Sequence, residues 1–198
     1  MQALKELKRR LIPGRVYRRA DIAALSGAAD RYLRQLVEAD ELRKPMAGVY
    51  YRPRKSAFGN VPADERKIVE AFLKDNDFLV VSLNSYNTLG VGTTQLYNER
   101  LVYNRKRDGR FCLDGQRYYF LKNRKFPGKV TEPFLLVDLV NNMDLLAEDR
   151  DALKDAIARK ALELGATKVS RAARAYGKAA TKKYLKRLLE EGNSADAG

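Results

Sequence analysis

The chain has 198 residues, 45% of them hydrophobic and 32% charged, which is enough to bury a core and form one medium or several small domains. Its 39 Lys and Arg against 25 Asp and Glu give a formal net charge of +14, which favours a polyanionic partner. The absence of histidine excludes Ser-His-Asp and Cys-His nucleophile activation, and the single cysteine, Cys112, excludes an intramolecular disulfide. No apolar run is long enough to span a bilayer and no secretory signal is visible, so we expect a cytoplasmic protein with no membrane partner.

The basic charge is concentrated in the first third of the chain. Residues 1–62 contain 14 Lys and Arg against 6 Asp and Glu. Residues 63–140 and residues 141–198 each have a net charge of only +3. This asymmetry favours a local electrostatic footprint for an anionic partner. A generally basic, solvated surface is the alternative that charge alone leaves open.

The first third predicts two short helices joined by a turn. Leucines at helical spacing end at the stop signal Pro13-Gly14, and a short strand is expected around Val16. Helical patterns follow over 20–25 and 28–39, separated by a turn that contains glycine. This order matches the helix-turn-helix arrangement, in which the second helix enters the major groove of DNA.

Polar side chains on the second helix and on a following β-hairpin are suited to DNA. Guanidinium groups bind guanine and carboxamides bind adenine through paired hydrogen bonds. The hairpin, expected over 42–52, would be a wing whose cations displace phosphate counterions. The candidate DNA-binding residues are Ala28, Arg31, Arg34 and Gln35 on the recognition helix, and Arg43, Lys44, Arg52, Arg54 and Lys55 on the wing and its flanks. The alternative is a winged helix that uses these solvated faces for protein contacts.

The middle of the chain predicts an α+β segment that begins with a helix over 64–73. Strands are expected at 78–81, 101–104, 110–113 and 117–121. Asp-Gly turns separate the last three, and such turns are typical of β-hairpins. We therefore expect a small antiparallel meander with Cys112 packed on its central strand.

The last third predicts helices. They are expected over 134–142, 148–164, 167–176 and 179–190. The final helix is rich in Lys, which indicates either a second contact with nucleic acid or a toxin, or a solvated face on a packed helix.

No catalytic constellation is visible in the sequence. Gly90-Val91-Gly92 lacks the third glycine of a phosphate-binding loop, and the acids have no spacing that would organise Mg²⁺. We expect a protein that is not an enzyme and that has no cofactor and no metal. RNA binding is a further alternative, because tyrosines among Arg and Lys could stack on bases. These tyrosines are Tyr50, Tyr51, Tyr103, Tyr118 and Tyr119.

Several of these segments resemble the AbiEi-type antitoxins of type IV toxin–antitoxin systems. The resemblance covers about residues 12–145 and includes the expected winged helix and Phe58-Gly59-Asn60-Val61-Pro62. Residues 87–95 are similar to the family's Asn-x-Leu-Gly-Leu-x-Thr-Gln segment, with Val91 where leucine is usual and a more polar Gly92-Thr93. This segment contributes the candidate antitoxin-core residues Asn87, Gly90, Thr93, Thr94 and Gln95.

The resemblance implies a transcriptional repressor that binds double-stranded operator DNA through its N-terminal domain and autoregulates its operon. It also implies that the protein counters a nucleotidyltransferase toxin encoded beside it, without requiring a stable complex. A two-fold operator would favour a homodimer on DNA. The alternative, from another functional class, is a protein-interaction module that neutralises a toxin through its later segments, with DNA binding secondary.

The expected fold is therefore α+β, with an N-terminal winged helix-turn-helix, a central α+β segment with a small antiparallel meander, and C-terminal helices. The expected domains are the DNA-binding domain at 1–58, the antitoxin-like core at 59–145, the C-terminal helical region at 146–191 and a flexible tail at 192–198.

Overall fold

The structure, a computed structural model, describes residues 2–91, 96–122 and 124–195. Its contacts divide the chain into two compact units: Met1–Asp77 with Phe111–Arg117, and Phe78–Arg110 with Tyr118–Gly198. The expected mixed α+β class, with small antiparallel sheets and C-terminal helices, is confirmed. The domain boundaries at 58 and 145 stay predictions, because they concern units of function rather than compactness.

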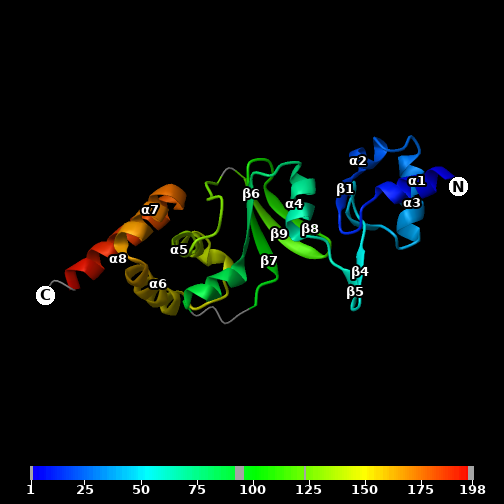
Figure 1. The fold of residues 1–198 in the computed structure, drawn as a ribbon. Helices are drawn as coiled ribbons and strands as arrows, with labels where there is room; N and C mark the ends of the chain where they lie inside the picture. Colours follow the sequence, from blue (N-terminus) through cyan, green and yellow to red (C-terminus); the bar gives the residue numbers. More distant parts are fainter. Residues whose placement is uncertain (1, 92–95, 123, 196–198) are drawn as a thin grey trace. The chain divides into compact units, whose positions relative to one another are not determined.

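The first unit begins with three helices and a three-stranded sheet (Figure 1). The elements are α1 (Gln2–Arg10), β1 (Val16–Arg18), α2 (Arg19–Ala23), α3 (Ala29–Glu38), β2 (Arg43–Met46) and β3 (Val49–Tyr51). The strands pair antiparallel in the order β1-β3-β2. Leu7, Ile22, Leu33 and Leu36 are buried in a common apolar cluster, which holds the three helices together. The sequence predicted each of these elements, from helical spacing, residue type or turn residues.

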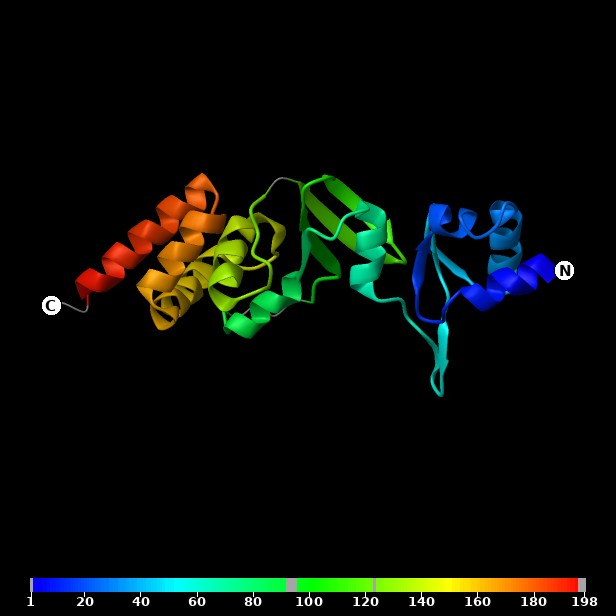
Figure 2. The same ribbon diagram turned by 45° about the horizontal axis from the view of Figure 1, so that its top comes forward.

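A second hairpin, which the sequence did not predict, follows the sheet. β4 (Arg54–Ser56) pairs antiparallel with β5 (Gly59–Val61), and Figure 2 shows this hairpin projecting from the rest of the first unit. The Ser56 hydroxyl accepts a hydrogen bond from the Phe58 amide and donates one to the Gly59 carbonyl, which closes the turn. Gly59 has a φ of +105°, a conformation that side-chain-bearing residues rarely adopt. The hairpin continues into α4 (Glu65–Leu73), where the Asp64 carboxylate caps the first turn by accepting from the Lys67 amide at 3.2 Å.

The expected meander is wrong in its strand order. The four-stranded sheet contains β6 (Phe78–Ser82), β7 (Glu99–Asn104), β8 (Gly109–Leu113) and β9 (Gln116–Lys122) in the order β6-β7-β9-β8. The physical reason lies in burial: β9 has neighbouring buried residues, Phe120 and Leu121, whereas β8 exposes Arg110 and Cys112. Natural sheets commonly place exposed charged side chains such as Arg110 on an edge strand, which fits β8 to the edge beside β9. Cys112 is therefore exposed on an edge strand, not packed on a central one.

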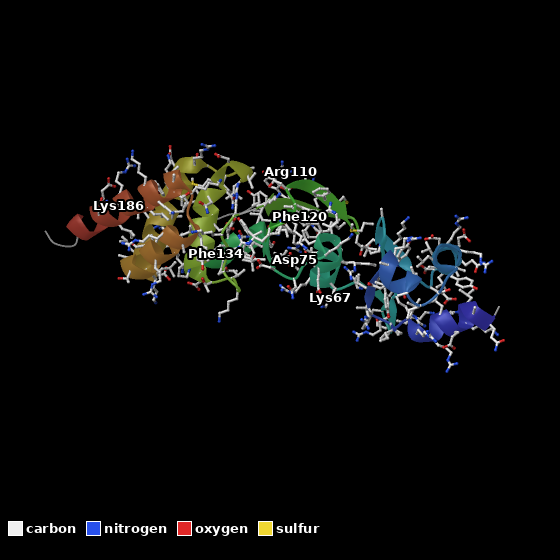
Figure 3. The ribbon with its side chains drawn as sticks, turned by 90° about the horizontal axis from the view of Figure 1, so that it is seen from above. Lys67, Asp75, Arg110, Phe120, Phe134 and Lys186 are labelled. Atoms are coloured by element: carbon white, nitrogen blue, oxygen red, sulfur yellow. The ribbon has the colours of Figure 1, made fainter. Side chains whose placement is uncertain are left out.

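The second unit is completed by helices. The elements are the 3-10 helices η1 (Leu83–Leu89) and η2 (Met143–Leu145), and the α-helices α5 (Glu132–Asn141), α6 (Arg150–Leu164), α7 (Ala166–Tyr176) and α8 (Ala179–Ala195). α5 is its central helix, because every residue from Phe134 to Leu139 is buried. In Figure 3 Phe134 lies among these helices, and its ring makes an edge contact with Tyr176 of α7. Among the described residues, no helix is long and apolar enough to cross a membrane.

Candidate nucleic-acid interface

The outward face of α3 carries the side chains that the sequence assigns to base contacts. Arg31, Arg34 and Gln35 are all exposed, while Leu33 and Leu36 of the same helix are buried. Ala28, the residue before α3, is half-buried. The apolar stripe thus fixes the helix against the core and leaves the polar stripe free to meet a partner.

Hydrogen bonds join the start of α3 to the turn of the β2–β3 hairpin. The Arg19 amide donates to the Gly48 carbonyl at 2.8 Å, and Gly48 lies in the hairpin turn. The Arg19 guanidinium binds the Asp30 carboxylate through both oxygens, with Nε 2.7 Å from Oδ1. Asp30 lies in the first turn of α3. The hairpin turn and the beginning of α3 therefore lie at the same end of the first unit.

This ion pair also changes the electrostatics at the start of α3. The hydrogen bonds from Arg19 lower the pKa of the Asp30 carboxyl below its ordinary value, and the same bonds raise the pKa of Arg19. A carboxylate in the first turn of a helix is favoured by the helix dipole. Arg19 is consequently neutralised by a protein group, and Arg31 and Arg34 are the arginines of α3 itself that face solvent.

Arg31 is held in a defined position on this face. Its guanidinium lies 5.0 Å from the centre of the Tyr32 ring, and Nη2 donates to the Tyr32 hydroxyl at 3.2 Å. Such stacking restricts the rotamers of a long side chain without neutralising its charge. Arg31 therefore presents an ordered guanidinium to solvent.

The cations assigned to the wing fall into two groups. Arg43 and Lys44 are exposed on β2, and Arg43 has an ion pair of 4.0 Å with Asp40. Arg54 and Lys55 are also exposed, but they lie on β4 and belong to the separate β4–β5 hairpin. The structure thus places only Arg43 and Lys44 on the β2–β3 hairpin.

Arg52 has a structural position that differs from its predicted phosphate contact. It is half-buried, and its Nη1 donates to the main-chain carbonyls of Lys8, at 2.8 Å, and of Leu11. These carbonyls lie at the end of α1, where they lack partners within the helix. Arg52 therefore anchors α1 to the end of β3.

The antitoxin-like segment is only partly described. Asn87 is exposed in η1, and its carbonyl accepts a hydrogen bond from the Gly90 amide at 3.1 Å. Gly90 ends η1 with a φ of +67°, which explains glycine there without a phosphate ligand. Thr93, Thr94 and Gln95 lie outside the described residues.

Sequence reasoning missed a buried polar cluster in the second unit. The Asp138 carboxylate accepts hydrogen bonds from the Tyr86 hydroxyl at 2.8 Å, from the Tyr103 hydroxyl, and from Asn142 Nδ2 at 3.1 Å. Desolvation raises the pKa of Asp138 to about 6 in spite of these donors, and it also raises the pKa of both tyrosines. The available signal was a lone acid inside the apolar run of 134–140. Within the residues that the structure describes, no group of three acids or cysteines could hold a metal ion.

No protein-family model and no curated protein sequence matches the chain. Among solved structures, the chain is similar to the RV2827C protein from Mycobacterium tuberculosis, known from a crystal structure, with a TM-score of 0.57 and 13% sequence identity. The similarity covers 96% of this chain and 75% of that one. At this identity it shows a shared α+β fold and nothing about activity.

Proposed function

We propose that the first unit is a winged helix-turn-helix that binds double-stranded DNA, with α3 in the major groove and the β2–β3 hairpin along the phosphates. The observation that carries this proposal is the element order α1-β1-α2-α3-β2-β3 with sheet order β1-β3-β2, combined with an exposed Arg31, Arg34 and Gln35 on α3. A helix joined by a turn to a second, polar-faced helix is the arrangement that reads base edges.

The charge of this region supports an anionic partner. Residues 1–62 have a net charge of +8, and the hairpin turn lies beside the start of α3 through the bonds of Arg19. Base-reading and phosphate-contacting groups can therefore meet the same duplex. Phosphate contacts would position the protein, and the α3 side chains would supply sequence preference.

Duplex DNA is favoured over RNA because the tyrosines considered for base stacking are not available. Tyr50, Tyr51, Tyr103 and Tyr118 have exposed fractions of 9%, 2%, 2% and 3%. The fifth, Tyr119, is half-buried under the Arg110 guanidinium, which lies 4.4 Å from its ring centre. Stacking on bases requires an open aromatic face.

We further propose that the protein is a repressor of the AbiEi antitoxin type, which autoregulates its operon and counters a nucleotidyltransferase toxin. This part of the proposal is supported by the sequence resemblance of the N-terminal segments and of residues 87–95. Neutralisation of the toxin is assigned to the second unit, which includes α5–α8.

The DNA-binding proposal is tested by fluorescence anisotropy with DNA from upstream of the gene and with an unrelated duplex of equal length. We expect tight binding to the first, with Arg31→Ala and Gln35→Ala each costing about 1–3 kcal/mol on that site and less on the unrelated duplex. Lys154→Ala, an exposed cation of α6 paired with Asp151, is the matched control and should leave both affinities unchanged. Equal affinity for the two duplexes would remove the repressor proposal.

Toxin neutralisation is tested separately with the full chain. The wild type and the Arg31→Ala/Gln35→Ala variant are co-expressed with the product of the adjacent gene. Rescue of growth by both proteins supports a neutralising role that is independent of DNA binding. Rescue by neither protein refutes the antitoxin proposal and leaves the DNA-binding proposal to its own test.

A further inference from the structure

The second unit contains a cavity that the proposed function does not use. It has a volume of about 240 Å³ and is bounded by α5, the α7–α8 junction, the segment after β9 and Tyr103 of β7. Its apolar walls include Phe134 and Tyr176, whose rings meet edge to face at 5.4 Å. Tyr103 and Asp138 are also among its lining residues.

The rim of this cavity is strongly basic. Four cations line it: Arg124, Lys125, Lys178 and Lys182. Asp138 is the single acid of the lining, and its carboxylate is buried and already accepts three hydrogen bonds from neutral donors. The lining therefore has a formal surplus of three positive charges.

Two of these cations are held in place by adjacent asparagines at the end of α5. The Arg124 Nη1 donates to Asn142 Oδ1 at 3.2 Å. The Lys178 amide donates to Asn141 Oδ1 at 2.9 Å, and its Nζ donates to the Asn141 carbonyl. All these acceptors are neutral, so they orient the two cations without cancelling their charge.

Arg124 and Lys178 repel each other at this rim. Burial lowers the pKa of Lys178 and the charge of Arg124 lowers it further, while the charges of Asp144 and Asp138 act in the opposite direction without reversing the shift. α8 begins at Ala179 with no acid in its first turn, so the positive end of the helix dipole adds to the same potential. Among the described residues, none of the four rim cations has an ion pair with a carboxylate within 4 Å.

Gly177 allows this arrangement by its lack of a side chain. A Cβ at this position would stand 2.6 Å from the Ala173 carbonyl oxygen and 3.1 Å from Lys182 Cγ. A larger residue would therefore displace the start of α8 or the stem of Lys182. Because Gly177 lets the chain pass close to Ala173 and to the stem of Lys182, both Lys178 and Lys182 line the same cavity.

From this convergence of four cations on an aromatic-walled cavity, we infer that the second unit binds a small phosphate monoester. Charge decides between oxyanions: a carboxylate or a phosphodiester supplies one negative charge, whereas a phosphate monoester supplies nearly two at pH 7. Size limits the rest of the ligand, because the cavity is smaller than the 300–1,000 Å³ of typical sites for drug-sized molecules. The lining residues belong to the second unit and α3 to the first, so the phosphate test does not depend on the DNA-binding proposal.

The test is isothermal titration calorimetry of the full chain at pH 7 in low chloride, with three probes. These are inorganic phosphate, glycerol phosphate as a monoester and dimethyl phosphate as a diester. We expect one site with a Kd below about 1 mM for the first two and at least about tenfold weaker binding of the diester. Equal binding of the diester, or no saturable heat from inorganic phosphate and glycerol phosphate, would overturn the inference.

Variants locate the site. Arg124→Gln and Lys182→Gln should each weaken phosphate binding at least about tenfold. Lys182 is exposed, so its replacement keeps the test valid if Arg124→Gln fails to fold. Lys154→Gln, on α6 and away from the cavity lining, is the control and should bind phosphate like the wild type. A loss in the control as large as in Lys182→Gln would assign the binding to general surface charge.

Discussion

The buried carboxylate of Asp138 makes the stability of the second unit depend on pH in a predictable direction. Its pKa is raised from 3.8 to about 6 in the folded protein, chiefly because burial disfavours the charged form. The folded state therefore binds a proton more tightly at this group than the unfolded state does. The buried, charged carboxylate lowers the unfolding free energy by its full amount above pH 6, and this loss of stability is relieved as the pH falls from 6 towards 3.8.

The size of the effect follows from the two pKa values. A shift of this size corresponds to about 3 kcal/mol in total, at about 1.4 kcal/mol per pH unit. Between pH 7 and pH 4.5 about 2 kcal/mol of this should be recovered. Asp138→Asn keeps the shape of the side chain but cannot titrate. The difference in unfolding free energy, wild type minus Asp138→Asn, should thus rise by about 2 kcal/mol as the pH is lowered from 7 to 4.5.

Urea unfolding followed by far-UV circular dichroism at several pH values measures this difference, since the chain has no tryptophan for fluorescence. The same substitution at Asp144, whose side chain is 81% exposed, controls for the loss of one carboxylate. The variant's own hydrogen bonds change the offset between the curves but not their dependence on pH. A flat difference between pH 4.5 and pH 7 would refute a raised pKa at Asp138.

Three other outcomes follow from the same structure. Arg52→Ala should lower the unfolding free energy by about 1–3 kcal/mol, because it removes donors from two carbonyls at the end of α1, whereas Arg54→Ala should be nearly neutral in thermal melts. Gly90→Ala should destabilise the second unit by about 1 kcal/mol, since it forces a residue with a Cβ to adopt a φ of +67°, and urea unfolding measures this cost. The logarithm of the DNA association constant should fall linearly with the logarithm of salt concentration, and Lys44→Ala should make that slope shallower by about 0.9 in anisotropy titrations.

Local signals predicted most helices and strands. The start of α4 is set by the Asp64 cap, and the start of α5 by the Thr131 hydroxyl, which accepts from the Phe134 amide. Apolar periodicity also predicted which face of α3 is buried, because Leu33 and Leu36 recur at helical spacing. These features depend on residues within a few positions of each other, which a sequence displays directly.

Features that depend on distant residues were not predicted. The β6-β7-β9-β8 order depends on pairing between strands that are distant in the sequence, and no local pattern in β8 or β9 indicates which strand lies beside it. Arg52 was assigned to phosphate because nothing near it in sequence shows that its partners are the Lys8 and Leu11 carbonyls, more than 40 positions away. The short, polar β4–β5 hairpin lacks the apolar alternation that marks a strand.

The outward face of α3 was predicted from the sequence, while its role as a DNA interface stays a prediction. The exposure of Arg31, Arg34 and Gln35 agrees with the expected outward face of the helix, and it is a property of amphipathic spacing. Ordering of Arg31 by Tyr32 and the Arg19–Asp30 ion pair were not foreseen, since both depend on side-chain geometry. The basic cavity of the second unit combines residues from four separate segments and has no motif in the sequence.

The placement of α3 against DNA is tested most directly by cleavage from a tethered reagent. Cys112, the single cysteine, is replaced by serine, a new cysteine is introduced by Gln35→Cys, and an iron chelate is attached to it. With α3 in the major groove, hydroxyl radicals should cut the upstream DNA at a few neighbouring nucleotides on each strand. The same reagent on Lys154→Cys should give no such cluster. Dispersed or absent cuts from position 35, while the labelled protein still binds this DNA, would contradict the assignment of α3 as the recognition helix.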